Sequence, residues 1–264
     1  MSATTPDDTA ALADFYRRAL LDDVIPFWLR HGLDREHGGY LTALDRDGTV
    51  IDTDKSIWFQ GRGAWTFATL CNTVEKKPEW LAAARSGIEF LREHGSAPDG
   101  KLYFTVTHDG QPLRMRRYAY SESFAAIAHA AFANAGENGE SAEEAKRYFE
   151  TYLTRSFEPN RTPPKISPET RPSMGVGPLM IGLATAQEVR ANLGEVNIKG
   201  WTCSEWIDWF IDQIETYFLK PDHEVLMEVV AADGSIIDHF DGRQLNPGHA
   251  IECGTQVTGG NYAF

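Results

Sequence analysis

Three Asp-Gly pairs recur at a regular interval along this chain of 264 residues, each flanked by alternating apolar residues. They fall at residues 47–48, 109–110 and 233–234, so the second follows the first by 62 residues and the third follows the second by 124, twice that interval. The pairs predict short β-hairpins over 40–51, 102–115 and 225–237. At the intermediate position, residues 160–172 form a Pro-rich loop instead. The spacing predicts an internal structural repeat.

Helical periodicity of apolar residues fills the segments between these turns. Thr5 is the expected N-cap of the first helix, with Pro6 in its first turn and Gly32 at its end. Repeats of helix pairs bury their apolar faces either by stacking as an open solenoid or by curving into an α/α toroid around a cavity. The predicted helices cover 6–31, 57–74, 78–94, 122–135, 142–157, 174–193 and 202–219.

Two of these helices favour the toroid. The second and fourth are apolar around most of their circumference, as expected of inner helices held between an outer ring and a lumen. Each nevertheless begins with polar residues, Gln60 and Arg62 in one, Tyr120 and Glu122 in the other. Because these polar residues lie at helix starts beside the connecting loops, they are expected to line the entrance of the cavity.

Composition restricts the partners. Thirty-eight acidic and 25 basic residues give a net charge of −13, which would repel nucleic-acid phosphates and anionic lipid surfaces. No apolar run approaches the roughly 18 residues of a membrane-spanning helix, and the acidic N-terminal segment does not resemble a signal peptide. The three cysteines lack C-x-x-C spacing. We expect a cytoplasmic protein without nucleic-acid or membrane partners.

Arg62 is the first candidate for chemistry. A guanidinium near an apolar core needs acceptors, which a structural ion pair would supply. The functional alternative is an arginine that holds sugar hydroxyls or stabilises an oxyanion. The residue alone leaves both open.

A second candidate lies in the segment RQLNPGHAIE at 243–252. Asn-Pro-Gly predicts a turn into a helix, on which His249 and Glu252 share a face because they stand three residues apart. His249 could move a proton near neutral pH, with Glu252 orienting or tuning the imidazole. A helix cap or a core histidine is the structural alternative. H-x-x-E lacks a second histidine, so no metal site is expected.

These residues stand in blocks that resemble the N-acylglucosamine 2-epimerase family, which includes renin-binding protein, cellobiose 2-epimerases and mannose isomerases. The blocks follow family order and cover residues 12–253. They are FW at 27–28, 34–40, WFQGR at 58–62, YSESF at 120–124, 174–183, and RQLNPGH at 243–249 with Glu252.

The resemblance implies an all-α fold, an (α/α)6 barrel or toroid with its site in the central cavity. It implies a sugar 2-epimerase, which interconverts N-acyl-D-glucosamine and N-acyl-D-mannosamine by inversion at C2. A related aldose such as mannose or glucose is the other substrate that the resemblance allows. By position, His249 is one of two catalytic histidines on opposite faces of the substrate, Glu252 is its companion carboxylate, and Arg62 suits the enediolate oxygen. The expected substrate-binding residues are Trp58, Gln60, Tyr120, Glu122, Met174, Arg243 and Asn246.

Met174 follows the pattern of the N-acylglucosamine epimerases, where cellobiose epimerases have a histidine, and this favours an N-acetylated monosaccharide or a simple hexose. No cofactor is expected. A nucleotide effector, known in parts of the family, is left open because no phosphate-binding loop is visible, and a homodimer is left open as well.

The chain departs from the family at its end. Family members are longer, with further helices that close the ring and carry the second histidine, whereas this chain ends at Phe264. The composition of 254–264 argues against the helix that normally continues here. We expect a partial barrel domain over 1–253, an atypical tail over 254–264, and a truncated, frame-shifted or misjoined chain. An open toroid predicts marginal stability or association through its exposed edge.

Two other hypotheses remain. A glycoside hydrolase on the same barrel class would need two carboxylates across the scissile bond, for which Glu122 and Glu252 are candidates. A non-catalytic sugar-binding or protein-binding fragment is the third, favoured by the missing second histidine.

Overall fold

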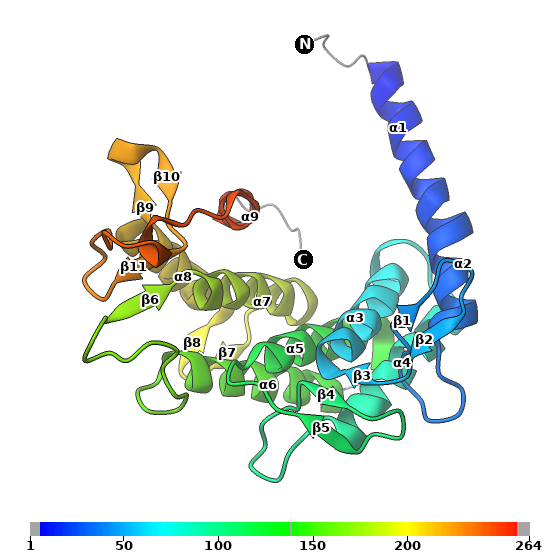
Figure 1. Cartoon of the computed structure of the whole chain (residues 1–264). Helices are drawn as coiled ribbons and strands as arrows, with labels where there is room; N and C mark the ends of the chain where they lie inside the picture. The colour runs from blue at the N-terminus through cyan, green and yellow to red at the C-terminus, as the bar shows by residue number, and fades with distance from the viewer. Residues whose placement is uncertain (1–5, 138, 258–264) are drawn as a thin grey trace.

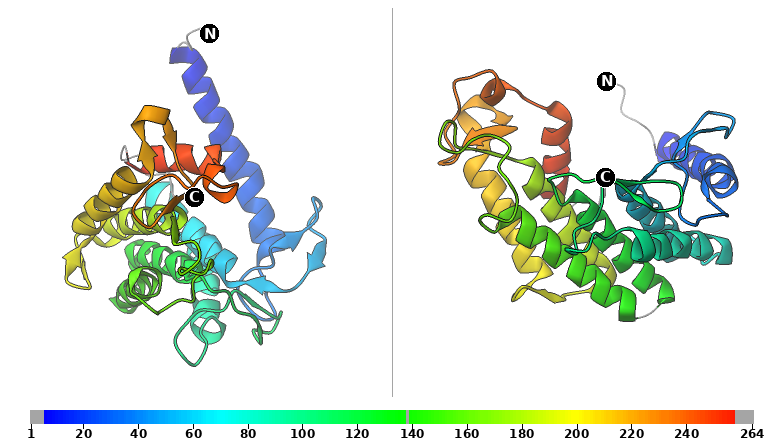
Figure 2. Two further views of the ribbon diagram at one scale, coloured as in Figure 1. Left: turned by 60° about the vertical axis from the view of Figure 1, so that its left-hand side comes forward. Right: turned by 60° about the horizontal axis from the view of Figure 1, so that its bottom comes forward.

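The computed structural model of the chain describes residues 6–137 and 139–257, and its helices form an inner and an outer layer (Figure 1). Among the described residues, α3, α5, α7 and α9 contact one another in that order, while α4, α6 and α8 each pack on the helix that precedes them. The arc does not close into a ring within the described part of the chain (Figure 2). It is an incomplete α/α toroid, as predicted. These helices are α3 (Ile57–Thr73), α4 (Pro78–His94), α5 (Tyr120–Phe132), α6 (Gly139–Phe157), α7 (Gly177–Leu193), α8 (Cys203–Tyr217) and α9 (Pro247–Val257).

Helix α5 is the centre of the packing. All its residues from Ser121 to Phe132 are buried, because α3 and α7 flank it and α6 covers it from outside. The helix is rich in alanine, which lets its neighbours approach closely. A Cβ at Gly61 of α3 would lie 2.8 Å from the carbonyl carbon of Phe124, so glycine is required at this contact. The predicted inner pair, α3 and α5, is confirmed.

The first predicted helix is also confirmed. α1 (Pro6–Arg18) continues through the π-helical turn η1 (Ala19–Val24), the short α2 (Ile25–Phe27) and a second π-helical turn, η2 (Trp28–Gly32). The expected N-cap, Thr5, lies outside the described residues. α1 projects from the body (Figure 1), and its apolar residues are largely exposed.

The first two predicted hairpins are present. β1 (Ala43–Leu44) pairs with β2 (Val50–Asp52), and β4 (Thr105–Val106) pairs with β5 (Pro112–Arg114) and also with β3 (Lys55–Ser56). A further hairpin, β7 (Asn197–Ile198) with β8 (Trp201–Thr202), was not predicted. Thr202 also caps α8 with a capping box completed by Glu205.

The third predicted hairpin is wrong in its pairing. The Asp233-Gly234 turn forms, but β11 (Val229–Ala231) pairs with β6 (Ser173–Gly175), where Val230 lies opposite Met174, 56 residues earlier in the chain. β10 (Val225–Leu226) pairs with β9 (Leu219–Lys220). Met174 is therefore in a strand and not in the predicted helix 174–193, which begins at Gly177 with a proline in its first turn.

The remaining ends differ by a few residues. α5 and α6 begin earlier than predicted, and η3 (Ala133–Glu137), a π-helical turn, follows α5. Two 3-10 turns, η4 (Pro221–His223) and η5 (Asp241–Arg243), precede α9. α9 extends to Val257, so the prediction of no helix from residue 254 was wrong for 254–257, and 258–264 lie outside the described residues. No helix in the described ranges is long and apolar enough to cross a bilayer.

Candidate functional site

Buried polar contacts fix the start of α3, which carries the first site residues. Lys55 Nζ donates to Asp34 Oδ2 at 2.6 Å and to the carbonyl of Gly38 at 2.7 Å. Burial alone would raise the pKa of Asp34, but the bonds from Lys55 and from two backbone amides outweigh it and hold the pKa at about 2. Gln60 bonds with both ends of its amide to the backbone of Tyr40. These contacts fix the loop of residues 34–40 to the start of α3.

A cavity of about 360 Å³ lies among α3, α5, α7 and α9. Aromatic and aliphatic side chains form most of its wall, and a small set of charged groups faces it. Such a mixture is usual for small-molecule sites. Its lining residues are Trp58, Arg62, Tyr120, Phe124, Gly177, Met180, Ile181, Glu228, His249 and Glu252.

Arg62 is the cationic group of the cavity. Its Cζ lies 4.6 Å from the centre of the Phe124 ring and 5.6 Å from that of Trp58. Its Nε is buried without an acceptor among the described residues. Burial lowers the pKa of the guanidinium, and the Glu252 carboxylate opposes this by attraction. Arg62 therefore presents a positive charge beside two aromatic rings, and its guanidinium has N–H groups free to donate to an oxygen of a bound ligand.

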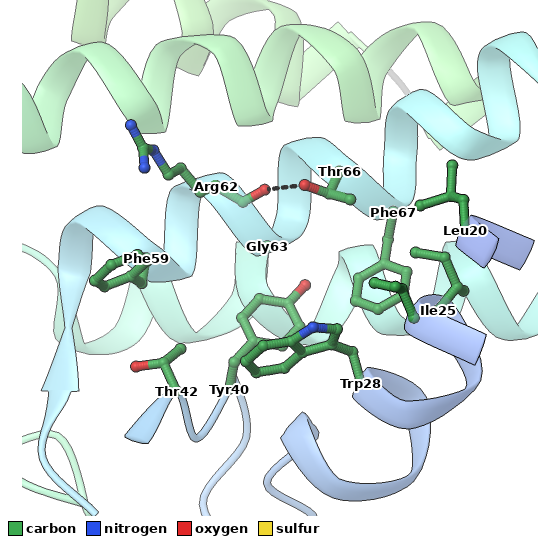
Figure 3. A pocket seen from close by; sticks show the side chains of 11 residues that line it. Leu20, Ile25, Trp28, Tyr40, Thr42, Phe59, Arg62, Gly63, Thr66 and Phe67 are labelled. Carbon is green, nitrogen blue, oxygen red and sulfur yellow. Dashed lines mark hydrogen bonds between the residues drawn. The ribbon is translucent and has the colours of Figure 1, made fainter. Parts of the chain in front are cut away.

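The guanidinium points away from a second, apolar pocket on the other side of α3. That pocket, of about 220 Å³, is walled by Trp28, Tyr40 and Phe67 (Figure 3). Arg62 contributes only its stem there, and its carbonyl accepts a hydrogen bond from Thr66 Oγ1 at 2.8 Å (Figure 3). The two sides of α3 therefore have different chemistry.

His249 is the histidine of the site. It lies in the first turn of α9, where its backbone N–H is 3.3 Å from Asn246 Oδ1. Its Nδ1 lies 2.9 and 3.1 Å from the two carboxylate oxygens of Glu228. Its Nε2 makes no hydrogen bond to a described residue. All eight histidines of the chain lie in the described ranges, and His249 is the one that lines this cavity.

The companion of His249 differs from the one expected. Sequence reasoning paired the imidazole with Glu252, but in the described part of the chain no hydrogen bond or ion pair joins these two side chains. The carboxylate at the imidazole is that of Glu228, which the sequence analysis did not single out. Glu252 acts instead on the charge of Arg62.

Tyr120 and Trp58 form an aromatic wall, with ring centres 6.1 Å apart. Burial, followed by the neighbouring Tyr118, raises the pKa of Tyr120 to about 12, so its hydroxyl stays protonated near neutral pH. Trp58 Nε1 is buried with no acceptor among the described residues. The wall therefore offers hydrogen-bond donors rather than a second base.

The structure brings together half of the residues predicted for the site. Gln60 is committed to Tyr40, and Met174 lies in β6. Arg243 is exposed and paired with Asp238. Asn246 serves the backbone of His249 rather than lining the cavity. The five that do line it are Trp58, Arg62, Tyr120, His249 and Glu252.

Glu122 is also outside the cavity. Its side chain is fully buried, Oε1 accepts the backbone N–H of Leu102 at 3.0 Å, and burial raises the pKa of the carboxyl. The pairing of Glu122 with Glu252 that a glycoside hydrolase would need is therefore not formed. No group of three or more His, Cys, Asp or Glu side chains in the described ranges is arranged to hold a metal ion.

Residues 39–257 match the family described as N-acylglucosamine 2-epimerase (GlcNAc 2-epimerase). The chain is 32% identical to N-acylglucosamine 2-epimerase of Rattus norvegicus over 240 residues, which are 89% of this chain and 56% of the rat protein. For the Homo sapiens protein the identity is 32% over 243 residues, 89% of this chain and 55% of that protein. The structure of cellobiose 2-epimerase from Spirochaeta thermophila DSM 6192 superposes with a TM-score of 0.78 at 21% identity, covering 97% of this chain and 65% of that one. The chain spans little more than half the length of its mammalian relatives.

Proposed function

Because the chain belongs to the N-acylglucosamine 2-epimerase family, we propose that its cavity removes and returns the proton on C2 of an open-chain aldose. One observation carries this proposal: a cation with unused donors, Arg62, and an imidazole with an unused nitrogen, His249, line the same cavity. This is the pair of groups that the chemistry needs.

The imidazole is the base. A proton on the carbon next to an aldehyde becomes removable once the sugar ring opens, because the electron pair can pass to the carbonyl oxygen. His249 Nε2 takes this proton, the C2–H electron pair forms the C1–C2 double bond, and the aldehyde oxygen becomes the enolate oxygen. Returning the proton to C2 regenerates the aldehyde.

The guanidinium stabilises the enolate oxygen. Arg62 carries a fixed positive charge beside two aromatic rings, where water screens it less than at an open surface. Donors aimed at a developing oxyanion are worth about 10²–10³ in rate in other enzymes. Attraction by Glu252 opposes the lowering of the Arg62 pKa by burial and so favours the charged guanidinium.

The substrate class is an N-acylated hexosamine. The mammalian relatives are named N-acylglucosamine 2-epimerases, which supports an N-acyl-D-glucosamine and N-acyl-D-mannosamine pair. The spare indole donor of Trp58 and the protonated hydroxyl of Tyr120 suit the carbonyl and hydroxyl oxygens of such a sugar. Mannose or glucose would leave part of these donors unused.

Inversion requires a second base on the opposite face of C2. The described cavity wall holds one histidine, and Tyr120, with a pKa of about 12, is already protonated near neutral pH and so cannot take up the proton. We therefore propose that this chain exchanges the C2 proton with solvent faster than it inverts C2. Three buried free cysteines support action in a reducing compartment, the cytoplasm.

The test is hydrogen exchange at C2 in D₂O, followed by NMR, with N-acetylmannosamine, N-acetylglucosamine and mannose. We expect exchange with the N-acetylated sugars, a loss of at least about 100-fold in His249→Ala, and unchanged exchange in His223→Ala, an exposed histidine away from the cavity. No exchange above the buffer rate with any sugar would contradict the proposal.

A further inference from the structure

Glu228 is held in place from a distant part of the chain. It directly precedes β11, and its carbonyl accepts the backbone N–H of Val176, just before α7, at 3.1 Å. The β11–β6 pairing fixes the same segment through three residue pairs. The backbone of Glu228 is therefore tied to the start of an inner helix rather than to a free loop.

The carboxylate of Glu228 faces one nitrogen of His249. Both of its oxygens lie within 3.1 Å of Nδ1, and its side chain is 25% exposed. An ionised carboxylate only accepts hydrogen bonds, so Nδ1 must carry the hydrogen. The other nitrogen, Nε2, then has a lone pair, which is the form that a base requires.

We propose that Glu228 is the positioning residue of His249: it holds the imidazole in the tautomer with hydrogen on Nδ1 and directs basic Nε2 at the substrate. This inference rests on the proposed function. While Nε2 takes the C2 proton, the Nδ1 hydrogen stays bonded to Glu228, whose charge balances the imidazolium until the proton returns to C2. Glu228 exchanges no proton with the sugar. A carboxylate that orients a general-base histidine acts in this way in hydrolases.

The two carboxylates of the cavity thus divide the work. Glu228 lies at the imidazole, and Glu252, which also lines the cavity, raises the pKa of the Arg62 guanidinium by electrostatic attraction. Sequence spacing favoured Glu252 for the first role because it lies one turn after His249 on α9. His249 Nδ1 nevertheless contacts the carboxylate of Glu228, just before β11, rather than that of Glu252 on its own helix.

The test measures the tautomer directly. Long-range ¹H–¹⁵N NMR of the His249 ring, above pH 8, is expected to show hydrogen on Nδ1 in the wild-type chain. In Glu228→Gln the amide can donate to Nδ1, which moves the hydrogen to Nε2 and blocks the base. We expect the C2 exchange rate to fall by about 10²–10⁴ in kcat, as for a histidine in the wrong tautomer, while KM changes less than about threefold.

Two further variants sharpen the test. Glu228→Asp keeps the charge on a shorter side chain, so we expect the Nδ1 tautomer to persist and part of kcat to return. Glu224→Gln removes the same charge from an exposed position four residues earlier and should change neither readout. Thermal melts establish that each variant is folded, and Glu228→Asp carries the test if Glu228→Gln is not.

The outcomes separate the two proposals. If folded Glu228→Gln kept the hydrogen of His249 on Nδ1, the inference would be overturned. Wild-type values of kcat and KM in this variant would also overturn it. A tautomer shift in that variant, combined with no C2 exchange in the wild-type chain, would support the positioning of His249 and overturn the proposed function instead.

Discussion

Gln60 and Tyr40 exchange two hydrogen bonds, one in each direction. Gln60 Oε1 accepts the Tyr40 N–H at 2.7 Å, and Gln60 Nε2 donates to the Tyr40 carbonyl at 2.9 Å. The Gln60 side chain is fully buried, and Tyr40 also donates its hydroxyl to the carbonyl of Ala83. Gln60 thus ties the N-terminal loop to α3 and acts on the fold rather than on a sugar.

Gln60→Ala is expected to lower the free energy of unfolding by about 2–3 kcal/mol, because it leaves a buried N–H and a buried carbonyl of Tyr40 without partners. The KM for C2 exchange should not change, since Gln60 does not line the cavity. Urea unfolding measures the first quantity. Gln111→Ala, at an exposed glutamine, is the control. A raised KM at unchanged stability would restore Gln60 to the binding site.

Arg62 should be sensitive to both charge and shape. Arg62→Met removes the cation from beside the enolate oxygen, and we expect kcat for C2 exchange to fall by about 10²–10³. Arg62→Lys keeps the charge but loses the planar set of donors, so an intermediate rate is expected. Steady-state exchange by NMR gives both parameters. Equal activity of all three proteins would show that the guanidinium has no part in the reaction.

Asp34 makes stability depend on acid pH. Its folded pKa, about 2, is below its ordinary value of 3.8, so it stabilises the fold fully above pH 4 and loses this effect as the pH falls toward 2. Its side chain is almost fully buried against Lys55, with His108 Nε2 also 2.7 Å away. We expect Asp34→Asn to cost about 2 kcal/mol at pH 7.

The difference in the free energy of unfolding between wild type and Asp34→Asn should become smaller as the pH falls from 4 to 2. Urea unfolding at several pH values measures it, with Asp222→Asn at an exposed site as the control. A constant gap across this range would mean that the variant acts through packing alone.

The exposed apolar residues of α1 should promote association. Leu12, Phe15 and Tyr16 are 48%, 58% and 67% exposed, and Leu20 and Val24 in the following turn η1 are also exposed and line the apolar pocket. Contiguous apolar surface of this kind tends to be covered by another molecule. We expect Phe15→Ser combined with Tyr16→Ser to lower the weight-average mass in sedimentation experiments at high concentration, whereas Arg17→Ser should not. A wild-type chain that stays monomeric with one sharp melt would contradict this.

Local patterns in the sequence predicted most of the fold. The bounds of α4 are those predicted, and those of α3 differ by one residue at its end, because apolar spacing and flanking Pro or polar residues act within a few residues. The Asp-Gly turns at 47–48 and 109–110 close hairpins for the same reason. The third turn forms as well, yet its strand finds a partner in β6. Turn chemistry identifies a turn, but it does not decide which distant edge a strand meets.

The same distinction explains the site. His249, Arg62 and Trp58 could be found from the sequence because their helices were recognisable and the blocks around them resemble a family. Glu228 could not, because the β6–β11 pairing that places it at the imidazole joins segments that are 56 residues apart at Val230 and Met174. Glu122 was misjudged for the opposite reason. A carboxyl in an apolar helix indicates a buried acceptor as readily as a ligand group, and here it receives the Leu102 amide.

The small contact area of α9 limits the temperature range over which the proposed C2 exchange can occur. The helix carries His249 and Glu252, is 11 residues long, and buries only Cys253 and Gln256 within its described length. Its main contact is with α7, helped by one hydrogen bond from Gln187 Nε2 to the carbonyl of Gln256. Short helices with few buried residues open in local fluctuations well before the whole fold does. On warming, we therefore expect the proposed C2 exchange to be lost at a lower temperature than that at which the α3–α5–α7 core unfolds, because His249 would no longer be held in the cavity.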